Sequence, residues 1–182
     1  MTDLSIVIFS CNVRDLLRRC LRSIYNFSAD PRGKEVARVD GRTCPDLALQ
    51  VIVVDNASSD GSVRMVQDCF PDVQLVVNER NRGFPAANNQ GIAAADGRYV
   101  LLLNPDTEIV SDALMQLAAF GDQHRDVGLV GPQLLNPDGS IQSSRRRFPT
   151  LTTAFLESTW LQPAIADRRS RTLAGVLTAP LR

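Results

Sequence analysis

The chain has 182 residues with 20 basic and 20 acidic side chains, so its formal net charge is zero. A protein without a net positive charge is not expected to bind nucleic acid nonspecifically. The composition, 44% hydrophobic and 22% charged, is typical of soluble globular proteins and argues against the disordered, fibrous and transmembrane classes. No apolar run approaches the ~20 residues of a membrane helix. No secretory signal is visible, so we expect a cytoplasmic protein.

The two signs of charge are distributed unevenly along the chain. Residues 1–142 carry 13 basic and 18 acidic groups, whereas residues 143–182 carry 7 and 2. A basic tail can dock peripherally on an acidic surface, such as the inner face of a membrane, although solvated charge on a loose terminus is the commoner explanation. The sequence leaves both explanations open.

The cysteines follow no recognisable ligand or disulfide pattern. They are Cys11, Cys20, Cys44 and Cys69. Because their spacing fits neither a zinc site nor a dense disulfide framework, we expect reduced thiols that mostly fill the core.

Apolar residues alternate along the chain between the spacing of strands and the spacing of helices. Strands are predicted at residues 4–9, 49–54, 73–77, 99–103 and 127–130. Helices are predicted at residues 13–27, 63–70, 83–95 and from 111 or 112 to about 118. The second helix is expected to bury Val63, Val66, Cys69 and Phe70.

Local sequence signals mark the ends of these elements. Asn12 precedes the first helix and is expected to cap it, and Pro85 suits the first turn of the third helix. Residues 28–48 show neither apolar period and are predicted to form a surface loop, although its length is unusual in a compact domain.

Four successive alternations of strand and helix, with strands that are apolar on both faces, predict an α/β fold. Its sheet should be mostly parallel and covered by helices on both faces. Ligands of such sheets bind beyond the carboxyl ends of the strands. The segments expected at that edge are residues 10–12, 55–60, 78–84 and 104–108.

Aspartates follow two of these strands, at Asp55 and Asp106. A carboxylate at this position can bind a ribose or a base, or it can hold Mg²⁺ or Mn²⁺ against phosphates. Aspartate, asparagine and serine also cap helices at such turns, so for either segment alone the two explanations are evenly balanced.

The tetrapeptide Leu-Asn-Pro-Asp occurs at residues 103–106 and again at 135–138. The second copy is followed by Gly139, which is typical of a surface turn. The first copy ends the strand that looks most buried in the sequence, at residues 100–103. Asp106 is therefore the better metal candidate.

Several other site classes find no support. Residues 9–14 contain no glycine, which argues against a dinucleotide-binding fingerprint. No Walker pattern is present, and the single histidine, His124, is expected at a solvated helix end. A phosphatase of the haloacid dehalogenase type needs an aspartate nucleophile after the first strand, where this chain has Ser10 and Cys11.

Four stretches together resemble the GT-A glycosyltransferases of family 2, particularly the bacterial rhamnosyltransferase-like branch. They are residues 4–8, 51–62, 78–91 and 97–106, in the family's order, within a similarity that extends from residue 3 to about residue 150. The resemblance implies a GT-A, Rossmann-like fold that binds a dTDP-, UDP- or GDP-sugar. It places Asp55 on the base and Asp106 on the Mg²⁺ or Mn²⁺ ion of the diphosphate. The residues implied in nucleotide-sugar binding are Ser10, Cys11, Asn12, Asp55, Asn56, Gly83, Phe84, Asn88, Asn104 and Asp106.

The chain departs from the family pattern in its metal motif and in its length. Asn104-Pro105-Asp106 replaces the stricter aspartate-x-aspartate motif, so metal affinity is expected to be modest. Family members continue further, into the acceptor-side strands and the acidic pair that supplies the general base. We therefore expect residues 1–142 to be the donor-binding half and residues 143–182 to be a basic tail with an incomplete acceptor side. No catalytic residue is assigned.

The first functional hypothesis is an inverting sugar transferase of cell-envelope synthesis with a glycan or lipid-linked acceptor. The alternative is a nucleotide-binding module without turnover, or one chain of a split enzyme, and the chain alone is expected to transfer sugar poorly. Apolar surface left beside an absent acceptor side would favour a homo-oligomer or a partner chain.

Overall fold

The computed structural model describes residues 2–26 and 47–143. The chain divides into two units, Met1–Pro132 and Gln133–Arg182. Within the described part of the first unit, one sheet has the strand order β3-β2-β1-β4, and all three pairings are parallel. Its strands are β1 (Leu4–Ser10), β2 (Leu49–Asn56), β3 (Gln74–Asn78) and β4 (Tyr99–Leu103).

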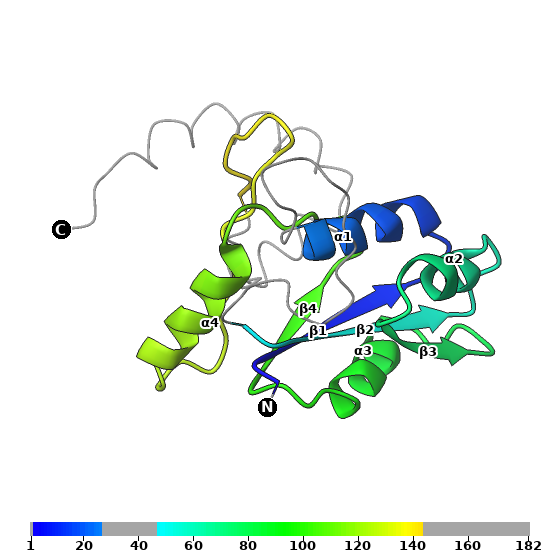
Figure 1. Cartoon of the computed structure of the whole chain (residues 1–182), viewed down its shortest axis with the longest axis horizontal. Helices are drawn as coiled ribbons and strands as arrows, with labels where there is room; N and C mark the ends of the chain where they lie inside the picture. Colours follow the sequence, from blue (N-terminus) through cyan, green and yellow to red (C-terminus); the bar gives the residue numbers. More distant parts are fainter. Residues whose placement is uncertain (1, 27–46, 144–182) are drawn as a thin grey trace, which may run out of the picture. The chain divides into compact units, whose positions relative to one another are not determined.

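Helices cover both faces of this sheet, as Figure 1 shows. They are α1 (Arg14–Asn26), α2 (Ser62–Cys69), α3 (Phe84–Ala93) and α4 (Ala113–Gln123). Buried residues of α1, α2 and α4 share one apolar cluster with β1 and β2, and α3 contributes Ala87 to the cluster on the opposite face. The predicted α/β fold with a parallel sheet and helices on both faces is confirmed.

The central strand β1 explains why the strands read as apolar runs. Its residues Ile6, Val7 and Ile8 are fully buried, because successive side chains alternate between two helix-covered faces. On one face α3 approaches closely at Gly91, where a Cβ atom would collide with the side chain of Val7. Glycine is therefore needed at this crossing.

Helix α1 buries one stripe of its surface. Leu17, Cys20, Leu21 and Ile24 are completely buried. These positions are three or four residues apart, which places them on one helical face against the sheet. The predicted helix is confirmed, and it begins one residue later than predicted, at Arg14.

Three predictions about burial and pairing are wrong. Residues 127–130 form no strand, and Leu129 is 95% exposed. This apolar run finds no partner strand in residues 2–26 and 47–143, and a strand needs such a partner to satisfy its backbone groups. The second wrong prediction is the burial of β4, in which Val100 and Leu102 are exposed. Helix α3 packs over β1 and β2 and leaves this face of β4 uncovered.

The third error concerns the cysteines and α2. Met65 and Val66 are the buried apolar residues of α2, whereas Cys69 is exposed at its last turn. Cys11 is half-buried and Cys20 is buried. Cys44 and most of the loop predicted at residues 28–48 lie outside the described residues. Only one of the three described thiols therefore fills the core.

In the second unit, the structure describes the repeat of the tetrapeptide as a turn. Gly139 has a φ of 81°, and Leu135 and Ile141 form an antiparallel bridge on either side of it. The Asp138 carboxylate accepts hydrogen bonds from the backbone N–H and the hydroxyl of Ser140, at 2.9 and 2.6 Å. The structural turn predicted here is confirmed.

Candidate functional site

A cavity of about 250 Å³ opens beside the carboxyl ends of β1 and β4 and the first turn of α3. It is lined by Phe9, Cys11, Val13, Leu16, Phe84, Asn104, Pro105 and Asp106. Four of the predicted site residues, Cys11, Phe84, Asn104 and Asp106, therefore meet in one cavity. This is the sheet edge at which α/β proteins bind their ligands.

An aromatic pair forms one wall of this cavity. Phe84 is 53% exposed, and its ring meets the ring of Phe9 edge to face, with the centroids 5.4 Å apart. Gly83 precedes it with φ 81° and ψ 160°, a conformation that is accessible essentially only to glycine. Gly83 thus sets the direction in which the chain enters α3 and presents Phe84.

Asp106 is the acid that lines the cavity. Its side chain is exposed and has no hydrogen-bond or ion-pair partner in the described part of the chain, whereas the nearby Glu108 lies 3.9 Å from Arg19. Burial raises the pKa of the Cys20 thiol to about 12, and the charges of Asp106 and Glu108 add to this effect. The Asp106 carboxylate is open to a cation or a polar ligand.

Asp55 and Ser10 lie next to each other in the register of β2 and β1. Both are buried, with Asp55 only 1% exposed. The Oδ2 atom of Asp55 accepts a hydrogen bond from the N–H of Ser58 at 2.9 Å, but its Oδ1 atom and the hydroxyl of Ser10 have no partner among the described residues. Buried polar atoms without partners are uncommon in folded proteins and invite a ligand explanation.

The loops after β1 and β2 are joined by hydrogen bonds. Asn12 donates its backbone N–H to the hydroxyl of Ser58 at 2.9 Å, and its side-chain oxygen accepts the N–H of Ser59 at 2.8 Å. The backbone N–H of Arg14, the first residue of α1, donates to Asp60 at 2.8 Å. The prediction that Asn12 caps α1 is therefore wrong: Asp60 does so, and Asn12, with φ 54°, ties the two loops together.

Two further predicted residues are engaged with the protein and do not line the cavity. Asn88 is 6% exposed and donates to the backbone carbonyl of Phe84 at 2.9 Å, one turn earlier in α3. Asn56 is completely buried and bonds to the segment that follows β3. Their direct contact with a nucleotide stays a prediction.

The sequence reasoning singled out the segment after β3 but missed the individual amide residues that organise it. Asn78 and Gln90 exchange two hydrogen bonds, at 2.9 and 3.0 Å, and Asn81 accepts one from Asn56 at 2.6 Å. The available signal was the density of asparagine and glutamine between residues 78 and 90, since side-chain amides both donate and accept.

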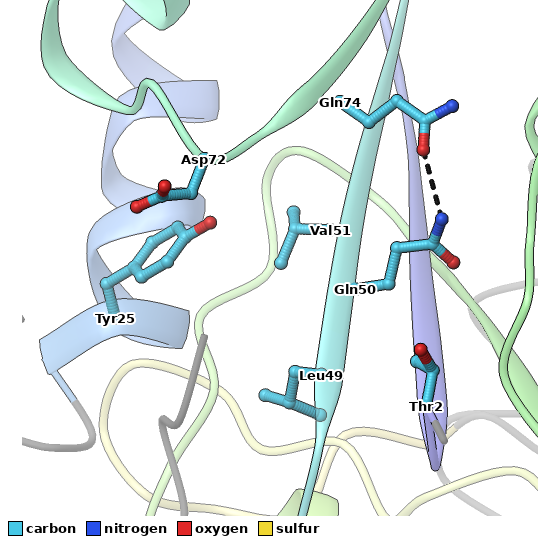
Figure 2. A pocket seen from close by; sticks show the side chains of 7 residues that line it. All are labelled: Thr2, Tyr25, Leu49, Gln50, Val51, Asp72 and Gln74. Atoms are coloured by element: carbon cyan, nitrogen blue, oxygen red, sulfur yellow. Dashed lines mark hydrogen bonds between the residues drawn. The ribbon is translucent and has the colours of Figure 1, made fainter. Parts of the chain in front are cut away.

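A second cavity of about 280 Å³ lies at the opposite end of the strands and is shown in Figure 2. It is lined by Thr2, Tyr25, Leu49, Gln50, Val51, Asp72 and Gln74. Burial, with a contribution from the charge of Asp72, raises the pKa of Tyr25 to about 12. Gln50 donates to Gln74 at 3.0 Å and to the carbonyl of Ala94, and it accepts hydrogen bonds from Ser5 and Asp96. These contacts make this end a structural part of the sheet.

The described residues hold no group of three or more histidine, cysteine, aspartate or glutamate side chains that could bind a metal by themselves. Asp106 with Asn104 offers one carboxylate and one amide oxygen in the same cavity. This set fits Mg²⁺ or Mn²⁺ only if a bound phosphate completes the coordination, which is how Mg²⁺ is commonly held in nucleotide sites.

A family model described as "Glycosyl transferase family 2" matches residues 5–171, which is most of the chain. The chain belongs to glycosyl transferase family 2. The resemblance found in the sequence is confirmed. No helix in residues 2–26 or 47–143 is both long and apolar enough to cross a bilayer.

Curated relatives of this family 2 chain include enzymes from different bacteria. The N-acetylglucosaminyl-diphospho-decaprenol L-rhamnosyltransferase of Mycobacterium tuberculosis is 29% identical over 114 residues, covering 57% of this chain and 37% of the relative. The poly(ribitol-phosphate) β-N-acetylglucosaminyltransferase TarS of Staphylococcus aureus is 33% identical over 103 residues, covering 54% and 18%. The chain thus spans well under half the length of these relatives.

Solved structures of S. aureus TarS have the same fold over most of this chain. Residues 1–349 of TarS match with a TM-score of 0.53 and 22% identity, covering 68% of this chain and 33% of that one. The same part of TarS in complex with UDP-GlcNAc matches with a TM-score of 0.51 and 24% identity. The GT-A assignment of the fold is thereby confirmed.

Proposed function

We propose that this chain binds the nucleotide-sugar donor of an inverting glycosyltransferase that acts in cell-envelope glycan synthesis. The observation that carries the proposal is the convergence of Cys11, Phe84, Asn104 and Asp106 on one cavity at the carboxyl end of the sheet. Membership of family 2 supports the reaction class. The transferred group is a hexosyl or rhamnosyl unit, and the acceptor is a glycan or a lipid-linked saccharide.

The proposed roles follow from the chemistry of each group. Asp55 has a buried carboxylate oxygen without a partner, which suits an N–H donor of the base. Asp106 and Asn104 would hold Mg²⁺ or Mn²⁺ together with the diphosphate. The bound cation would neutralise the charge that develops on the departing nucleoside diphosphate.

The transfer step also needs a base that removes a proton from the acceptor hydroxyl, a contribution typically of ~10²–10⁴ in rate. Asp106 is the only acid among the residues that line the described cavity, and it is assigned to the metal. We therefore propose that residues 1–142 supply donor binding and that the base lies elsewhere in the complete enzyme. The alternative is a nucleotide-binding module without turnover, or one chain of a split enzyme whose base lies on another chain.

We further propose that the protein acts in the cytoplasm and that its basic segment, residues 143–182, contacts the membrane peripherally. The supporting observation is the charge of that segment, 7 basic groups against 2 acidic ones. A membrane-flotation assay with anionic and neutral vesicles distinguishes membrane contact from a solvated basic segment. Binding to anionic vesicles that is lost at high salt supports the contact, and equal behaviour with both vesicles rejects it.

A thermal-shift panel tests donor binding. A ligand that binds only the folded state raises the unfolding midpoint, by an amount that grows with the logarithm of its concentration relative to Kd. We expect one of the UDP-, dTDP- or GDP-sugar classes to raise Tm in the presence of Mn²⁺ or Mg²⁺. The absence of a shift with every nucleotide sugar at millimolar concentration would reject the proposed function.

A further inference from the structure

We propose that Asn56 is a positioning residue that orients the side chain of Asn81 beside the cleft, the cavity lined by Cys11, Phe84 and Asp106. Asn56 acts on the nucleotide through Asn81 and does not touch the nucleotide. The proposal rests on the proposed function for its link to nucleotide binding. Its structural core, the coupling of Asn56 to Asn81 and of Asn81 to Cys11, is independent of that function.

The contacts of Asn56 argue against a direct role. Its side chain is completely buried at the end of β2. The Oδ1 atom accepts hydrogen bonds from the side chain of Asn78 at 3.1 Å and from the backbone N–H of Arg82 at 3.0 Å. The Nδ2 atom donates to Asn81 at 2.6 Å. Asn56 therefore connects two strands to the segment after β3.

The same contacts determine which way the amide of Asn81 points. Its Oδ1 atom receives two donors, the side chain of Asn56 and the backbone N–H of Gly83, the latter at 2.8 Å. Since an N–H group cannot accept either bond, the oxygen must lie on this side. The Nδ2 atom is then directed to the sulfur of Cys11, 3.6 Å away. Cys11 lines the cleft, so a donor group is presented at its edge.

A reciprocal pair of amides anchors the network at its other end. Asn78 and Gln90 exchange two hydrogen bonds between β3 and α3. A continuous series of side-chain amides thus extends from α3 through Gln90, Asn78, Asn56 and Asn81 to Cys11. Such networks lose more than one bond when a member changes, because the remaining buried groups are left unpaired.

Replacing Asn56 by aspartate tests the inference sharply. The variant Asn56→Asp keeps the size and the accepting oxygen but removes the donor to Asn81. Two oxygens would then face each other, and the amide of Asn81 is expected to rotate, which withdraws its N–H from Cys11. The N–H of Gly83, next to Phe84 of the cleft, loses its partner at the same time.

The chain offers a matched control on the same strand. Gln50 and Asn56 are an even number of residues apart on β2, so they face the same side of the sheet. The side chain of Gln50 accepts from Ser5 and Asp96 and donates to Gln74 and Ala94. The variant Gln50→Glu therefore breaks a comparable amide network at the opposite end of the strand, away from the cleft.

Three quantities are measured for the wild type, Asn56→Asp, Asn81→Ala, the double variant and Gln50→Glu. They are Tm, the Kd for the nucleotide found in the thermal-shift panel, and the alkylation rate of Cys11 relative to the exposed Cys69, followed by peptide mass spectrometry. Rotation of the Asn81 amide, or its removal, takes the N–H donor away from the Cys11 sulfur, so the alkylation rate of Cys11 relative to Cys69 should change several-fold.

We expect Asn56→Asp and Gln50→Glu to lower Tm, but only Asn56→Asp to weaken nucleotide binding, by roughly tenfold, and to change the alkylation rate of Cys11. Asn81→Ala should reproduce both effects, and the double variant should add little, because the two residues act in series. Additive effects of the two changes would overturn the proposal. Equal weakening by Gln50→Glu would also overturn it, since the loss would then be a general consequence of reduced stability.

The two possible failures are distinguishable. If the wild type binds no nucleotide, the proposed function is rejected, and the Cys11 alkylation rates still decide whether Asn56 orients Asn81. If the wild type binds and Asn56→Asp leaves both the Kd and the Cys11 rate unchanged, the positioning role is rejected and the proposed function stands.

Discussion

Asp60 accepts the backbone N–H of Arg14 at 2.8 Å, across 46 residues of sequence. Its other carboxylate oxygen accepts the N–H and the hydroxyl of Ser62, the first residue of α2. One side chain therefore satisfies donors at the starts of two helices, and it fixes the loop after β1 against the loop after β2. Both loops lie at the edge of the sheet that carries the candidate cleft.

The first prediction concerns this shared cap. We expect Asp60→Ala to lower the free energy of unfolding by about 1 to 2 kcal/mol, the upper part of the range for a lost helix cap, because two helix starts lose a partner. Urea unfolding measures the change. Asp68→Ala serves as the control: Asp68 forms only an exposed pair with Arg64 within α2, so its loss should be small. A loss for Asp60→Ala no greater than for this control would contradict the assignment.

The second prediction concerns acid stability at the other end of the sheet. Arg98 lies 2.9 Å from Asp3 and 2.8 Å from Asp122, which also accepts the hydroxyl of Tyr99. Hydrogen bonds from Ala48 and then Arg98 lower the pKa of Asp3, and those from Arg98 and then Tyr99 lower the pKa of Asp122. Both carboxylates are therefore more acidic in the folded state.

A carboxylate with a lowered folded-state pKa stabilises the fold at pH values above its unfolded pKa of about 3.9. This stabilisation is lost as the pH falls through the folded-state pKa. Between about pH 5 and pH 2 we expect the Tm of Asp122→Asn to fall less steeply than that of the wild type. High salt should reduce the difference, since the groups are partly exposed to solvent. Identical pH dependence of the two proteins would rule out this contribution.

The third prediction concerns backbone strain in the loop after β2. Ala57 has a φ of 65°, in the left-handed region that costs a non-glycine residue roughly 1–2 kcal/mol. After the greater backbone entropy of glycine is included, we expect Ala57→Gly to stabilise the fold by about 0.5 to 1 kcal/mol. Ala86→Gly, within α3, should instead lower the free energy of unfolding by about 1 kcal/mol. If thermal unfolding shows that Ala57→Gly destabilises the protein, the backbone at Ala57 is not strained as we infer.

Much of the fold follows from local patterns in the sequence. The alternation of strands and helices, the parallel sheet and the edge that holds Cys11 and Asp106 are all consequences of apolar spacing and of polar residues after strands. Asp60 escaped prediction because its partner Arg14 is distant in sequence, and only the finished sheet brings the two loops together. The strand predicted at residues 127–130 failed for a related reason: apolar spacing does not reveal whether a neighbouring strand is present to pair with it.

The sequence predicted only part of the candidate site, because the packing between distant segments decides which polar side chains face the cavity. Phe84 and Asp106 line the cavity, and both lie in segments between the end of a strand and the next helix, so the sequence pattern already indicates them. Asn56 and Asn88 carry the same polar signal, but their burial and hydrogen bonds depend on how α3 and the segment after β3 pack. Polarity at a strand end therefore identifies the region of the site and leaves open which side chains face the ligand.

Metal-dependent nucleotide binding tests the central claim most directly, because the chain contains its own control. Asp106 and Asp138 end identical tetrapeptides, yet Asp106 lines the cavity and Asp138 closes a turn through Ser140. Calorimetric titrations with UDP, dTDP and GDP in the presence of Mn²⁺ should give one binding nucleotide. Asp106→Asn should weaken that binding at least tenfold, and Asp138→Asn should leave it unchanged. Equal losses from both substitutions, or no heat with any nucleotide, would contradict the account.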